Sequence, residues 1–113
     1  MSNNLNAISP LDGRYKNSVK DLSACFSESA LIQYRLKVEI EYLIALGNEK
    51  SINNLPPFPK AVQIRLRRIY LNFNTAEAEK VKAIESTTNH DVKAVEYYIQ
   101  GKVKKALHPW IHF

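Results

Sequence analysis

The sequence has a single cysteine, Cys25, so the chain cannot form an internal disulfide. Small secreted domains usually carry several paired cysteines, and this sequence gives no sign of an oxidising compartment. Cys25 lies in the apolar run at residues 22–26. That setting predicts a buried, small hydrophobic side chain and not a reactive thiol.

Glycine is also scarce, with only Gly13, Gly47 and Gly101 in 113 residues. Chains rich in β-structure usually need more turn glycines, so the low count favours an all-α fold. Hydrophobic residues make up 45% of the chain, which is enough to build a core. A length of 113 residues suits one domain, and we expect residues 1–113 to form it.

Long apolar runs are absent. No uninterrupted stretch approaches the roughly 18 residues that a transmembrane helix needs, and no basic region followed by an apolar run marks a signal peptide. We therefore expect a cytoplasmic protein with no membrane partner.

The charge balance is basic, with 16 Lys and Arg against 11 Asp and Glu, a net charge of +5 and a pI near 9.4. A basic surface favours anionic partners. However, the cations are spread along the chain and no nucleic-acid motif accompanies them, so we expect no nucleic-acid partner. The Arg65, Arg67 and Arg68 cluster is interpreted as a solvated helix face.

The apolar spacing predicts four helices. The first runs from Ser27, a candidate N-cap, to Leu46, with Gly47 as the residue that ends it. It has two apolar faces, which suggests burial in something larger than this chain. One face comprises Ile32, Leu36, Ile40 and Leu43, and the other comprises Leu31, Tyr34, Val38 and Tyr42.

The other three helices are shorter. They are predicted over residues 60–73, from the Asn74 cap to Glu85, and from about Asp91 to Leu107, where Pro109 ends the last. The polar segment at residues 86–91 separates the third helix from the fourth. The chain then stops on the large apolar residues of 110–113, from which we infer that it is truncated.

The strongest local signal for chemistry is the polar segment that ends in Asn89, His90 and Asp91. A polar loop that enters a helix N-terminus offers free N–H groups and a helix dipole to an anion. His90 and Asp91 could orient each other there. A plain helix cap with a surface histidine is the commoner meaning of such a pattern, and the sequence leaves both interpretations open.

Two further candidates are weaker. Arg14 and Tyr15 follow the turn made by Asp12 and Gly13, but an arginine after a turn is usually only a surface charge. Histidines 90, 108 and 112 could suggest a metal, yet Pro109 breaks the helical spacing of the last two. No cysteine or carboxylate completes a site, so we expect no metal.

Three segments resemble the motifs of one enzyme family. Residues 9–15 read SPLDGRY, as in the family's SP-x-DGRY opening, and residues 87–98 read TTNHDVKAVEYY, as in its TTNHDVKAVEY motif. Residues 111–113 read IHF, which is similar to the residues before the family's next motif. The order and separation of the three also agree, so the sequence resembles the bacterial adenylosuccinate lyases of the fumarase/aspartase superfamily.

The resemblance implies the N-terminal helical domain of this lyase fold, truncated before the central helical bundle. It also implies β-elimination of fumarate from adenylosuccinate to give AMP, and from the succinyl-carboxamide ribotide, with no metal or organic cofactor. Arg14 and Tyr15 would contact the nucleotide, and Asn89, His90 and Asp91 would line the same pocket. His90 would bind phosphate or assist proton transfer, with Asp91 fixing its orientation.

The family's catalytic acid and base lie in motifs that this sequence does not contain, so we expect the chain alone to be inactive. The full-length family members are homotetramers, which makes self-association the expected partnership. Two alternatives remain: a non-enzymatic helical interaction module, and a basic nucleic-acid binder whose affinity falls steeply with salt.

Overall fold

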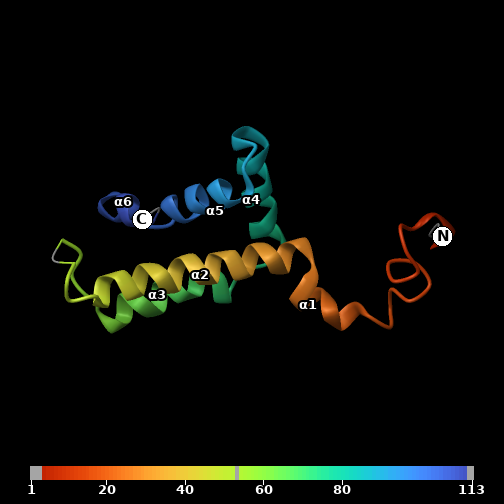
Figure 1. Cartoon of the computed structure of the whole chain (residues 1–113), viewed down its shortest axis with the longest axis horizontal. Helices are drawn as coiled ribbons and strands as arrows, with labels where there is room; N and C mark the ends of the chain where they lie inside the picture. The colour runs from red at the N-terminus through yellow and green to blue at the C-terminus, as the bar shows by residue number, and fades with distance from the viewer. Residues whose placement is uncertain (1–3, 53, 112–113) are drawn as a thin grey trace. The chain divides into compact units, whose positions relative to one another are not determined.

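The computed structural model describes residues 4–52 and 54–111, and every regular element in these ranges is a helix (Figure 1). The α-helices are α1 (Ser23–Phe26), α2 (Glu28–Asn48), α3 (Lys60–Leu71), α4 (Thr75–Thr88), α5 (Asp91–Gln100) and α6 (His108–Ile111). Short 3-10 helices occur at Asn4–Asn6, Lys20–Leu22 and Lys105–Leu107. The all-α expectation is confirmed.

The chain divides into two compact units, an N-terminal unit of residues 1–31 and a helical unit of residues 32–113. In the N-terminal unit the predicted turn is present. The Asp12 carboxylate accepts the Ser9 amide at 2.8 Å, and the Tyr15 amide donates to the Pro10 carbonyl at 2.9 Å. A Cβ on Gly13 would lie 2.8 Å from the Asn4 carbonyl oxygen, so the turn requires glycine there.

The prediction that Cys25 is buried is wrong, because the structure leaves it exposed in α1. Neither α1 nor the preceding 3-10 helix contains a buried residue, and Phe26 is 80% exposed. An apolar run is buried only where another element covers it, and none of the described elements of this unit does so.

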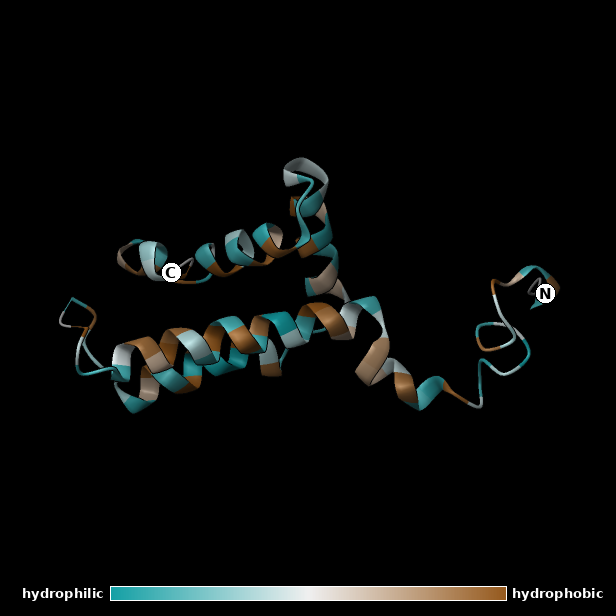
Figure 2. Cartoon of the chain, in the orientation of Figure 1, coloured by the Kyte–Doolittle hydropathy of each residue, from teal (hydrophilic) through white to brown (hydrophobic). Residues whose placement is uncertain are grey.

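Helix α2 begins as predicted, since the Ser27 hydroxyl accepts the Ala30 amide at 3.1 Å. Of its two apolar faces, the one with Ile32, Leu36, Ile40 and Leu43 is buried, and Leu36 and Ile40 are fully inaccessible. The second apolar face is exposed, and Val38 is 66% accessible. Figure 2 shows apolar residues along the length of α2, as expected for a helix with two apolar faces.

The role assigned to Gly47 is wrong, because α2 continues through it to Asn48 and no described glycine has a positive φ. Gly47 instead permits a close approach. A Cβ there would lie 3.0 Å from the Phe58 ring, so the small residue lets the segment before α3 pack on the end of α2.

Helix α3 runs beside α2 (Figure 1) and buries Leu66 and Tyr70, and it ends at Leu71 and not at the predicted Phe73. Arg67 corrects the interpretation of a solvated arginine face. Its guanidinium binds both carboxylate oxygens of Glu41 on α2, at 2.9 and 3.1 Å. The Tyr70 hydroxyl donates to the same carboxylate at 2.6 Å, so a polar network joins the two helices.

Helix α4 starts at the predicted cap, where the Asn74 side chain accepts the Glu77 amide at 3.0 Å. It extends three residues beyond Glu85, so the polar segment is helical as far as Thr88. Ser86 is compatible with the helix because its hydroxyl donates to the Ala83 carbonyl within the same helix, at 2.6 Å.

Helix α5 ends at Gln100, well before the predicted Leu107. The chain turns, forms the 3-10 helix, and enters α6, where Pro109 lies in the first turn. Proline is accepted there because the first helical residues need no intrahelical N–H donor, so Pro109 does not terminate a helix. His112 and Phe113 lie outside the described residues.

The core lies in the helical unit. Its members are Ile32, Leu36, Ile40, Leu43, Ile44, Leu46, Leu55, Leu66, Tyr70, Ala78, Val81, Ala94, Val95, Tyr98, Ile99 and Ile111. Among the described residues, no helix is both long and apolar enough to cross a membrane.

Candidate functional site

The α4–α5 connection holds three of the predicted site residues, Asn89, His90 and Asp91. Asn89 has φ 54°, the left-handed conformation, and it is the sole non-glycine residue with positive φ in the described ranges. Asparagine tolerates this conformation better than most residues do. It ends α4 and reverses the chain into α5, which exposes all three residues at the start of α5.

His90 is the N-cap of α5. Its Nδ1 accepts the Lys93 amide at 3.2 Å, while the Thr88 hydroxyl bonds to the His90 amide and carbonyl at 3.3 and 3.2 Å. With Nδ1 as an acceptor, the proton of the neutral ring lies on Nε2. The exposed imidazole can therefore donate a hydrogen bond to a ligand while it caps the helix.

Asp91 has a separate set of partners. One carboxylate oxygen accepts the Val92 amide at 2.8 Å, and the other pairs with Arg35 of α2 at 2.9 Å. The Val92 amide and then the Arg35 guanidinium hold the pKa of Asp91 below its usual value. The expectation that Asp91 orients His90 is corrected, because Thr88 and Lys93 position the imidazole.

Sequence reasoning missed Arg35. Its side chain is 29% exposed, and it fixes the N-terminus of α5 to the middle of α2. Nothing near Arg35 in the sequence marks it, since its partner lies on a helix far along the chain. Its positive charge is paired there with the Asp91 carboxylate, which the helix dipole also favours at the start of α5.

Arg14 and Tyr15 lie in the N-terminal unit, next to each other and both exposed. The guanidinium carbon of Arg14 lies 4.8 Å from the centre of the Tyr15 ring, a cation–π arrangement. Asn89, His90 and Asp91 belong to the helical unit. That the two groups share one pocket stays a prediction.

A second polar cluster surrounds Glu77 on α4. Its carboxylate receives hydrogen bonds from Lys80 at 2.8 Å, from Lys102 at 3.1 Å and from the Tyr98 hydroxyl. These three donors, with Lys80 the strongest, lower the pKa of Glu77 to about 2. Burial and the Glu77 charge raise the pKa of Tyr98. The cluster links α4 to α5 and the turn after it.

The described histidines are engaged in the fold. His90 caps α5, and the Nε2 of His108 lies 2.7 Å from the Gln100 carbonyl oxygen. Within residues 4–52 and 54–111, no group of three histidine, cysteine or acidic side chains is placed to hold a metal ion.

The known proteins that this chain matches share one name. The chain is 52% identical to an adenylosuccinate lyase of Dictyostelium discoideum over 106 residues, 93% of this chain and 23% of that protein. It is 47% identical to the adenylosuccinate lyase of Legionella pneumophila strain Philadelphia 1 and 40% identical to that of Escherichia coli K12, in each case over 96% of this chain and 25% of the relative. No family model matches the chain.

The chain thus spans about a quarter of the length of the curated relatives it matches. Their similarity covers 93% or more of this sequence. The predicted resemblance to adenylosuccinate lyases is confirmed.

Proposed function

We propose that the chain acts as the N-terminal domain of an adenylosuccinate lyase and supplies part of its nucleotide pocket. The observation that carries this proposal is the 40–52% identity to enzymes of that name across 93% or more of the chain. The exposed start of α5 supports it, because the helix dipole favours an anion there and the His90 ring can donate a hydrogen bond from Nε2.

The full-length enzyme would cleave a carbon–nitrogen bond by β-elimination. A base removes the proton from the carbon beside a carboxylate of the succinyl group. The electron pair forms the double bond of fumarate, the carbon–nitrogen bond breaks, and an acid protonates the leaving nitrogen. Adenylosuccinate gives AMP, and the succinyl-carboxamide ribotide is split in the same way.

The site residues take distinct roles in this proposal. Arg14 offers a planar guanidinium to the nucleotide phosphate, and Tyr15 flanks it. His90 donates from Nε2 to the phosphate or assists proton transfer, and Asn89 and Asp91 line the same pocket. Arg35 acts through Asp91 and is a positioning residue.

We assign neither the catalytic base nor the catalytic acid to this chain. The family's TS-x-D, THGQ-like and SS-x-MP-x-K-x-NP segments do not occur in the sequence. In the proposal they belong to the rest of a homotetrameric, cytoplasmic enzyme, and the 113-residue chain alone is inactive.

A chimera tests the proposal. The segment of the E. coli enzyme that matches this chain is replaced by residues 1–113, and fumarate release from adenylosuccinate is measured for the chimera and for the chain alone. We expect an active chimera and an inactive chain. A chimera that assembles as a tetramer but releases no fumarate would refute the proposed function, and activity of the chain alone would refute its dependence on other segments.

The non-enzymatic interaction module remains a second candidate because α2 exposes an apolar face that includes Tyr34, Val38 and Tyr42. It predicts that this face binds a partner whether or not the chimera is active. An active chimera in which substitutions on this face change nothing would exclude it.

A further inference from the structure

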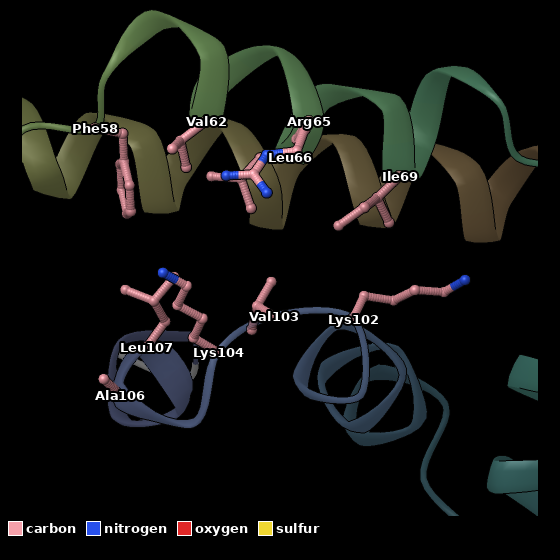
Figure 3. Close-up of a pocket in the computed structure, with 10 residues that line it drawn as sticks. All are labelled: Phe58, Val62, Arg65, Leu66, Ile69, Lys102, Val103, Lys104, Ala106 and Leu107. Atoms are coloured by element: carbon pink, nitrogen blue, oxygen red, sulfur yellow. The ribbon is translucent and has the colours of Figure 1, made fainter.

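A pocket of about 500 Å³ opens between α3 and the segment that follows α5 (Figure 3). It is lined by Phe58, Val62, Arg65, Leu66, Ile69, Lys102, Val103, Lys104, Ala106 and Leu107. Small-molecule sites in proteins typically have volumes of roughly 300–1,000 Å³. The pocket lies beyond the C-terminus of α5, whereas the candidate nucleotide site lies at its N-terminus, about 15 Å away along a ten-residue helix.

Two facing walls of the pocket are apolar. On one side Phe58, Val62 and Ile69 point from α3 and the segment before it into the space, and on the other Val103 and Leu107 point back toward them (Figure 3). These side chains are partly buried and pack on the core, so the walls are fixed by the fold. A hydrocarbon or aromatic group in this space would be removed from water on both faces.

The charged residues of the pocket are all cations: Arg65, Lys102 and Lys104. Lys102 is already paired with Glu77 at 3.1 Å. Arg65 and Lys104 have no acidic partner among the residues that the structure describes, and no carboxylate lies among the lining residues. An apolar space with two uncompensated cations at its edge is complementary to an apolar molecule with a negative head.

We propose that this pocket binds a compact anionic amphiphile, a medium-chain or aromatic carboxylate, with its apolar body between α3 and Leu107 and its carboxylate at Arg65 and Lys104. The interaction is independent of the lyase chemistry. The segment after α5, which lines one side of the pocket, would then contact the bound molecule.

Decanoate is the probe, titrated into the purified chain by calorimetry. The pocket variant Arg65→Gln/Lys104→Gln removes both cations. The control variant Arg68→Gln/Lys105→Gln removes the same charge from the same two segments, at exposed positions that do not line the pocket. We expect affinity to fall about tenfold in the pocket variant and less than twofold in the control, since two exposed charge pairs are lost only in the former.

A third variant tests occupancy. Ala106 is exposed and lines the pocket, so Ala106→Trp fills the space without disturbing the core. We expect it to abolish decanoate binding while circular dichroism stays unchanged, and we expect uncharged decanol to bind the native chain about tenfold more weakly than decanoate. Absence of saturable decanoate binding, or equal affinity in the pocket and control variants, would overturn the proposal. So would a sedimentation result in which Ala106→Trp disrupts a dimer of this chain, because a second copy would then occupy the pocket.

Discussion

At the residue scale, the two ring nitrogens of His90 have different surroundings. His90 caps α5 through Nδ1 and leaves Nε2 free to donate outward. The sequence could predict that a polar residue near position 90 would cap this helix, because the polar segment at residues 86–91 comes directly before apolar residues at helical spacing. It could not predict that His90 is the cap, since that depends on where the left-handed residue Asn89 ends α4.

Replacing His90 by alanine should lower the free energy of unfolding by about 1 kcal/mol, because the Lys93 amide loses its acceptor. His90→Asn should retain most of this stability, since asparagine is a preferred N-cap residue. Urea denaturation of the two variants measures the difference. Equal losses in both would show that capping is not what His90 contributes to stability.

Arg35→Gln should raise the pKa of Asp91 toward its usual value, because the guanidinium that favours the carboxylate is removed. The pKa should stay somewhat low, since the Val92 amide still donates to the same side chain. NMR titration of the Asp91 carboxyl measures this. Arg68→Gln, an exposed change elsewhere on the helical unit, is the control, and an unchanged Asp91 pKa in Arg35→Gln would contradict the ion pair.

At the element scale, the starts of α2, α3, α4 and α5 could be predicted from the sequence but their ends could not. Ser27 and Asn74 cap their helices through contacts within three residues, so the local sequence contains the whole signal. Gly47 and Pro109 suggested helix ends, and neither ends a helix. Gly47 lies where the Phe58 ring packs closely on α2, and Pro109 lies in the first turn of α6. Helix ends of this kind depend on packing between segments, and the spacing of apolar residues along the sequence contains no information about that packing.

The Glu77 carboxylate, which links α4 to α5, should make the stability of the fold depend on pH below the usual pKa of a glutamate side chain. The pKa of Glu77 is lowered from 4.5 to about 2, so its ionised form stabilises the fold. That contribution is complete above pH 4.5 and is lost as pH falls through 2. We expect Glu77→Gln to remove this part of the acid sensitivity and the exposed Glu79→Gln to leave it, as measured by thermal unfolding between pH 2 and 6.

If Glu77→Gln and the native chain lost stability in parallel over that interval, the Lys80, Tyr98 and Lys102 contacts would not stabilise the folded state.

At the scale of the whole molecule, α2 has two apolar faces with different exposure. The inner face is an apolar face that the period predicts, and Leu36 in it is completely buried. The outer face, with Val38 at 66% exposure, follows the same period, so the sequence could not distinguish the two. We expect other parts of the proposed enzyme to cover the outer face.

Leu36→Ala should destabilise the chain by about 2–5 kcal/mol, because it leaves a cavity in the core. Val38→Ala should change stability by less than about 0.5 kcal/mol, since that side chain is largely exposed. Urea denaturation compares the two. In the chimera, Val38→Glu should instead impair assembly, measured by sedimentation, and a normal tetramer would contradict a buried outer face.

The most direct test of the proposed nucleotide site is the kcat/KM of the chimera for adenylosuccinate, measured with His90 and with His90→Asn. The asparagine preserves the cap of α5 but removes the Nε2 donor. We predict a fall of about 100-fold or more with unchanged thermal stability, as expected when a group that assists substrate binding or proton transfer is lost. A kcat/KM within twofold of the parent chimera would mean that His90 is only a helix cap, and would contradict its place in the nucleotide pocket.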